Sequence, residues 1–172
     1  MLFNCSLKQN LMGDEKVLEY MRIAPGQGHE AGRRLLAKMY LERFGRPMPE
    51  ILTTDRGKPY FVDGSAYFSI SHTKKHVFCA LSQWPVGLDA EEEDREIDLR
   101  LADKILSPAE KKRFQEAQDP RQALLRFWVL KEAAAKLSGE GLRGYPNGTD
   151  VSPEDPAIRR IDGCFVALLE EK

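Results

Sequence analysis

The sequence is short of the features that mark secreted, membrane-spanning or zinc-structured proteins. Its three cysteines, Cys5, Cys79 and Cys164, are odd in number and far apart, so we expect neither a disulfide framework nor a zinc site. No apolar run is long enough to span a bilayer, and residues 1–10 lack the basic and apolar segments of a signal peptide. These absences favour a cytoplasmic protein.

An excess of charge of one sign is missing too. The 26 Lys and Arg residues face 27 Asp and Glu residues, which leaves a net charge of −1. No overall field attracts nucleic acid or an anionic membrane, so neither is an expected partner and any anion site must be local. A content of 42% hydrophobic and 31% charged residues is typical of a globular chain, and 172 residues suffice for one domain or two small halves sharing a core.

The first part of the chain predicts one helix followed by short strands. Apolar residues recur at helical spacing over 28–44, and a polar, turn-forming stretch occupies 53–61. Alternation of apolar and polar residues then indicates strands over 66–71, 77–82 and 86–91. The fold class that follows is α+β.

The second part of the chain is predicted to be mainly helical. Ser107-Pro108 and Asp119-Pro120 are start signals for two helices, and Gly139 and Gly141 end the second of them. A final strand is expected over 164–168.

The strand over 86–91 carries a pair of carboxylates. Gly87, Asp89 and Glu91 share one face, which places the two carboxylates roughly 6–7 Å apart along the strand. Without screening, that pair would repel by about 2–3 kcal/mol at an effective dielectric near 20. A bound cation would remove the cost, and Mg²⁺ prefers such oxygen ligands. The alternative is that Asp89 begins a solvated acidic loop over 91–94.

A second charged group lies on the helix that follows Pro120. Trp128, Glu132 and Lys136 fall one above another on a single face, with Lys131 beside them. Such a stripe can hold a metal ion and a polyanion together, because it offers both signs of charge. Alternatively, Glu132 and Lys136 form a salt bridge worth about 0.2–0.5 kcal/mol, and Trp128 packs in the core.

Other polar residues are candidates for binding phosphate. Ser71 and His72 end a strand, where hydroxyl and backbone N–H groups can bind phosphate oxygens, or they form an ordinary hairpin turn. Lys58 is a phosphate ligand or a turn lysine. Arg33 and Arg34 bind an anion or line the solvated face of their helix.

Taken together, four motifs resemble the 4′-phosphopantetheinyl transferase superfamily. They occur in the family's order and are Gly57-Lys58-Pro59-Tyr60, Phe68-Ser69-Ile70-Ser71-His72-Thr73, Val86-Gly87-Leu88-Asp89-Ala90-Glu91 and Trp128-Val129-Leu130-Lys131-Glu132-Ala133-Ala134-Ala135-Lys136, with the ending Gly139-Glu140-Gly141-Leu142. The chain is most similar to the monomeric two-half branch. That resemblance implies two pseudo-symmetric halves, about 1–85 and 86–172, each a small sheet packed with a long helix.

The resemblance also implies a metal and catalytic centre. Asp89, Glu91 and Glu132 would be Mg²⁺ ligands in the cleft between the halves, and Lys136 would neutralise the pyrophosphate of coenzyme A. Glu132 would be the general base, acting directly or through a metal-bound water. Lys136 and Glu132 are therefore the expected catalytic residues.

The remaining implied roles concern coenzyme A. Ser71 and His72 would contact its phosphates, and Lys131 would lie near the phosphates or the pantetheine arm. Lys58 would approach the adenine and the 3′-phosphate. Arg33 matches a family arginine that binds the 3′-phosphate, although the next residue is a near-equal candidate.

The implied reaction is transfer of 4′-phosphopantetheine from coenzyme A to a serine of an apo acyl or peptidyl carrier protein, with release of adenosine 3′,5′-bisphosphate. Carriers of fatty-acid, polyketide and nonribosomal peptide synthesis all fit. Two alternatives remain at this point: a degenerate protein that binds coenzyme A without transfer, and a non-enzymatic interaction module.

Overall fold

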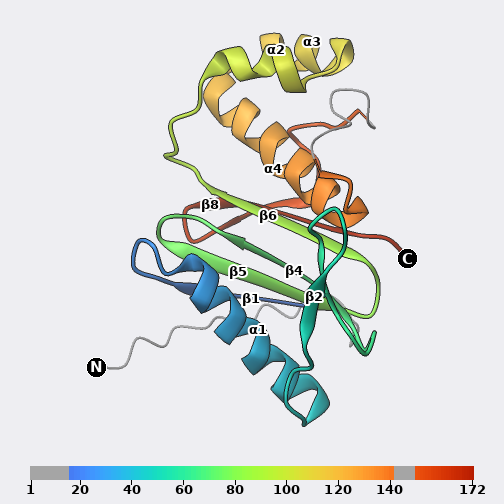
Figure 1. The fold of residues 1–172 in the computed structure, drawn as a ribbon. Helices are drawn as coiled ribbons and strands as arrows, with labels where there is room; N and C mark the ends of the chain where they lie inside the picture. The colour runs from blue at the N-terminus through green and yellow to red at the C-terminus, as the bar shows by residue number, and fades with distance from the viewer. Residues whose placement is uncertain (1–15, 142–149) are drawn as a thin grey trace.

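The computed structural model describes residues 16–141 and 150–172, and it has the mixed α+β architecture that the sequence predicts (Figure 1). Two three-stranded sheets face each other, and each carries one long helix on its outer side. This arrangement matches the expected fold class. Whether residues 1–85 and 86–172 are related halves stays a prediction. Residues 1–10, Cys5 and Leu142 lie outside the described residues.

The first sheet has the antiparallel order β1 (Lys16–Arg22), β5 (His76–Ser82) and β4 (Tyr67–His72). Helix α1 (Gly28–Phe44) covers its outer face and has the predicted bounds. The apolar face of α1 packs against alternate residues of β5, which form one core with it: Leu35, Leu36, Met39, Tyr40, Val77, Cys79 and Leu81. The hairpin β2 (Ile51–Thr53) and β3 (Pro59–Phe61) stands beside this sheet.

The second sheet has the antiparallel order β6 (Val86–Glu92), β8 (Cys164–Glu170) and β7 (Ile158–Ile161). Helix α4 (Pro120–Ser138) lies on its outer face and buries Leu125, Val129 and Ala133 against β7 and β8. The inner faces of the two sheets meet in a separate apolar core that contains Leu18, Tyr20, Phe78, Val86, Leu88 and Val166.

Short helices lead into α4, and a cap explains where α3 begins. The turn η1 (Leu99–Leu101) and helix α2 (Ala102–Ile105) precede α3 (Pro108–Glu116). Ser107 and Glu110 form the predicted capping box, because each side chain bonds to the backbone N–H of the other. Helix α4 ends at Gly139, whose φ of 75° is the left-handed geometry that glycine favours.

Two kinds of close contact fix β6 between its neighbours. The Ser69 and Ser71 hydroxyls on β4 accept hydrogen bonds from the backbone N–H groups of Leu88 (3.0 Å) and Ala90 (3.2 Å). On the other side β6 touches α4 directly, since a Cβ added to Gly87 would lie only 2.0 Å from the Ala133 carbonyl oxygen. The acidic strand is thus held between β4 and α4.

The sequence analysis missed some strands. The stretch over 53–61, expected to be only turn, contributes residues to both strands of the β2–β3 hairpin. Strands β1 and β7 were not expected, and β8 runs two residues beyond the predicted 164–168. Strands β4, β5 and β6 agree with prediction to within one residue at each end. Within the described ranges, none of the helices combines the length and apolar character needed to cross a membrane.

Candidate functional site

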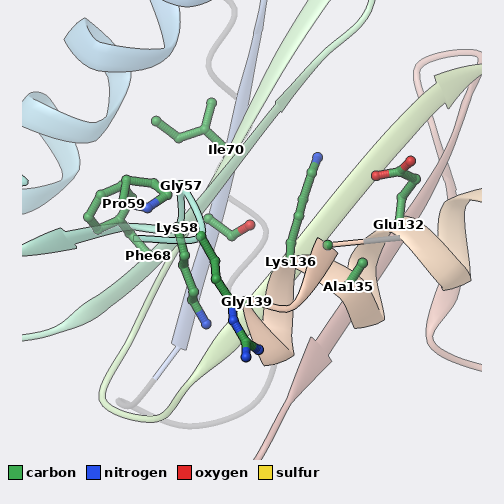
Figure 2. A pocket seen from close by; sticks show the side chains of 12 residues that line it. Gly57, Lys58, Pro59, Phe68, Ile70, Glu132, Ala135, Lys136 and Gly139 are labelled. Atoms are coloured by element: carbon green, nitrogen blue, oxygen red, sulfur yellow. The ribbon is translucent and has the colours of Figure 1, made fainter. Parts of the chain in front are cut away.

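A cavity of about 290 Å³ opens where the β2–β3 turn, β4 and α4 meet (Figure 2). Three of the predicted site residues, Lys58, Glu132 and Lys136, line it. The rest of its wall combines small and apolar residues with one arginine: Arg56, Gly57, Pro59, Phe68, Ser69, Ile70, Ala135, Gly139 and Gly141. The charged face of α4 is therefore turned toward a hollow between elements from both parts of the chain.

Asp89 lies under α4 and is almost fully buried, at 5% exposure. Its Oδ1 atom accepts hydrogen bonds from the Lys136 ammonium (2.7 Å) and the Ser71 hydroxyl (2.8 Å). Its Oδ2 atom is also buried and has no hydrogen-bond partner among the described residues. Since an unpartnered carboxylate oxygen is costly to bury, Oδ2 is an available ligand atom for a cation.

The two neighbouring carboxylates respond to the same buried charge. Burial, together with the nearby charge of Asp89, raises the pKa of Glu91 to about 7, although Arg95, Trp128 and Lys136 oppose the shift. Burial and the charge of Asp89 also raise the pKa of Glu132. Asp89, Glu91 and Glu132 therefore form one electrostatically coupled group.

This carboxylate group has the donor chemistry for a hard cation such as Mg²⁺. Its side chains do not already stand in a metal-binding arrangement: within residues 16–141 and 150–172, no three His, Cys, Asp or Glu side chains do. Glu91 is instead hydrogen-bonded and ion-paired to Arg95. The residues fit the ion by chemistry and by the orphaned oxygen of Asp89.

Trp128 is only partly buried, and it packs against the core between α2 and α4. The guanidinium carbon of Arg95 lies 5.9 Å from the centre of the Trp128 ring. A hydrogen bond from the Trp128 side chain lowers the pKa of Glu91. Trp128 thus acts as a packing residue that also borders the carboxylates. Arg95 was missed by sequence reasoning; its position four residues after Glu91 was the available signal.

The structure does not bring Lys131 to the cavity, contrary to the role implied by the resemblance. Its side chain is 1% exposed, and its ammonium forms a salt bridge of 2.9 Å with Glu110 of α3, which is fully buried. Lys131, like Leu130, lies on the side of α4 that faces the protein interior, whereas Glu132 and Lys136 are partly exposed at the cavity.

The other predicted ligands of coenzyme A lie in different settings. Ser71 is buried and bonded to Asp89, whereas His72 is exposed and its ring packs against Gly28 at the start of α1. Lys58 lines the cavity, but its ammonium donates to the Leu137 carbonyl at the end of α4, and burial lowers its pKa. Arg33 lies on α1 and is not among the residues that line this cavity.

Comparison with known proteins gives a consistent family. A model of the 4′-phosphopantetheinyl transferase superfamily matches residues 85–165. The chain is 30% identical over 129 residues to the 4′-phosphopantetheinyl transferase gsp of Aneurinibacillus migulanus, which covers 73% of this chain and 54% of that protein. It is 33% identical over 116 residues to psf-1 of Bacillus pumilus, covering 64% and 49%. It is also 33% identical over 119 residues to AcpT of Salmonella typhimurium, covering 66% and 62%. The chain spans about half the length of the first two relatives.

Proposed function

We propose that this chain, which belongs to the 4′-phosphopantetheinyl transferase superfamily, transfers 4′-phosphopantetheine from coenzyme A to a serine of an apo carrier protein. The observation that carries the proposal is the buried, unpartnered Oδ2 of Asp89, which lies among two further carboxylates and next to the Lys136 ammonium. Structural salt-bridge networks satisfy the large majority of their buried oxygens, so this one is better accounted for by a ligand.

Asp89, Glu91 and Glu132 would hold Mg²⁺. When bound, the ion supplies positive charge that stabilises the pyrophosphate during cleavage. Lys136 would share that role, because its ammonium already reaches into the carboxylate group and it lines the cavity. Lys58, which lines the same cavity from the β2–β3 turn, would add a second positive charge near the end of α4.

Glu132 would accept the proton of the attacking serine, directly or through water. The serine oxygen forms a bond to the phosphorus that bears pantetheine, and adenosine 3′,5′-bisphosphate leaves with the electron pair of the broken bond. A raised pKa makes a carboxylate a better proton acceptor near neutral pH, and burial together with the charge of Asp89 raises the pKa of Glu132. Glu132 also lines the cavity in which the substrate would lie.

Intact mass spectrometry of apo carrier proteins tests this function directly. After incubation with coenzyme A, Mg²⁺ and the full chain, we expect one phosphopantetheinyl group per carrier domain. Asp89→Ala and Glu132→Gln should each abolish the adduct while the protein stays folded, and Glu116→Gln, at an exposed position on α3, is the matched control. The proposal fails if no adduct appears on several unrelated carriers.

Two weaker alternatives are separated by titration with coenzyme A, with and without Mg²⁺. A degenerate protein would bind coenzyme A but give no adduct on any carrier. A non-enzymatic interaction module would bind neither ligand.

A further inference from the structure

Ser71 makes contacts that commit its hydroxyl to the protein itself. The side chain is 6% exposed and donates its proton to Asp89 Oδ1 at 2.8 Å. The Ser71 hydroxyl oxygen also accepts a hydrogen bond from the Ala90 N–H at 3.2 Å. A serine hydroxyl has a single proton to donate, so this one is not available to a phosphate oxygen at the same time. Ser71 is also not among the residues that line the cavity.

The effect of this bond falls on the carboxylate of Asp89. Its Oδ1 atom is held from two sides, by Ser71 on β4 and by Lys136 on α4 at 2.7 Å. Two donors from different elements restrict rotation of the carboxylate, because turning it would break both bonds at once. The orientation of the unpartnered Oδ2 is thereby set as well.

We propose that Ser71 is a positioning residue for the cation site: its hydroxyl orients the Asp89 carboxylate so that Oδ2 is presented to the ion, and donates to that carboxylate rather than to coenzyme A. This inference rests on the proposed function, since it assigns Ser71 to the metal centre of that same site. Groups that orient metal ligands by hydrogen bonding typically change metal affinity by about 10- to 100-fold when they are lost.

The neighbouring serine supplies a matched control. Ser69 lies two residues earlier on β4, is equally buried at 6%, and accepts the corresponding backbone bond from the Leu88 N–H at 3.0 Å. The hydrogen bond to the Asp89 carboxylate is made by Ser71. Loss of the Ser69 hydroxyl therefore removes a contact between β4 and β6 without changing the orientation of Asp89.

The test is direct binding of Mn²⁺, used as a probe for Mg²⁺, to the full chain without coenzyme A or carrier, measured by electron paramagnetic resonance. Ser71→Ala should weaken Mn²⁺ binding about tenfold or more. Ser69→Ala should change it less than about twofold, and Ser71→Thr, which keeps the hydroxyl, should recover most of the affinity. With saturating metal, the KM for coenzyme A should be the same in Ser71→Ala and the parent protein.

The possible outcomes distinguish a failure of this inference from a failure of the proposed function. If Ser71→Ala binds Mn²⁺ like the parent, or if its KM for coenzyme A rises while metal affinity is unchanged, Ser71 is not a positioning residue for the metal. If Ser69→Ala loses as much metal affinity as Ser71→Ala, the effect comes from contact between the strands and the inference is wrong. If the parent protein binds no Mn²⁺, the cation site itself is overturned, and the adduct assay then decides the transfer function separately.

Discussion

Replacing Lys131 by methionine should destabilise the protein strongly without weakening the proposed binding of coenzyme A. Lys131 and Glu110 are 1% and 0% exposed, and their charged groups lie 2.9 Å apart. The Glu110 carboxylate also accepts hydrogen bonds from the backbone N–H groups of Ser107 (2.8 Å) and Val151 (2.9 Å). Removal of the lysine leaves a buried carboxylate without its counter-charge, which costs about 3–5 kcal/mol of unfolding free energy.

Urea unfolding measures this loss. With an m value of about 2 kcal/mol per molar urea, the midpoint of Lys131→Met should fall by about 1.5–2.5 M. The control is Lys112→Met, an exposed lysine on α3, which should stay within about 0.5 kcal/mol of the parent. Adding Glu110→Gln to Lys131→Met should recover part of the stability, because no buried charge then remains.

The opposite pattern would refute the reasoning. If Lys131→Met unfolded at the midpoint of the parent protein but bound coenzyme A much more weakly, Lys131 would act at the ligand and not in the interior. The structural assignment would also be wrong if the stability losses of Lys131→Met and Glu110→Gln, each measured against the parent, simply added in the double variant.

Three further outcomes are expected. Gly87→Ala would place a methyl group 2.0 Å from the backbone oxygen of Ala133. It should therefore lower the unfolding free energy by about 3 kcal/mol, measured by thermal or urea unfolding. An unfolding midpoint equal to that of the parent would contradict the packing of β6 on α4. A hydrogen bond from Arg22 lowers the pKa of Asp162 to about 2 from 3.8. Asp162→Asn should therefore lose about 1 kcal/mol of unfolding free energy at pH 7. In urea unfolding, this difference from the parent should vanish as the pH falls from 3.8 to about 2. Burial raises the pKa of Cys164 to about 12, so iodoacetamide at pH 8 should leave it unlabelled in peptide mass spectra until the protein is unfolded.

Elements with strong local signals could be predicted from the sequence. Helix α1 begins and ends as expected, and the capping box of Ser107 and Glu110 forms as its spacing indicates. The C-terminal glycine of α4 adopts the left-handed geometry that its position suggested. The faces of β6 were also correct, with Val86 and Leu88 in the core between the sheets, because alternation on a strand fixes which side chains point together.

Features that depend on distant partners could not be predicted. The β2–β3 hairpin pairs three residues with three others across a polar turn. The apolar pattern of each strand is too short to predict a strand from the sequence. The position of Lys131 is a second case. Helical spacing places it beside the Glu132 stripe, but only the packing of α3 on α4 shows that it faces the buried Glu110. The sequence pattern alone therefore could not show that Lys131 lies away from the cavity.

Lys136 shows why the site required both the helix and the strand to be placed in space. Helical spacing alone made it a partner for Glu132, four residues earlier, in a weak salt bridge at the surface. In the structure its ammonium instead crosses to Asp89 on β6, at 2.7 Å, and its charge lowers the pKa values of both Glu91 and Glu132. One lysine thus offsets part of the mutual repulsion of all three carboxylates. The charge of Asp89 still contributes to the raised pKa values of Glu91 and Glu132 despite that lysine. The carboxylates therefore continue to repel one another, and a bound cation would relieve that repulsion.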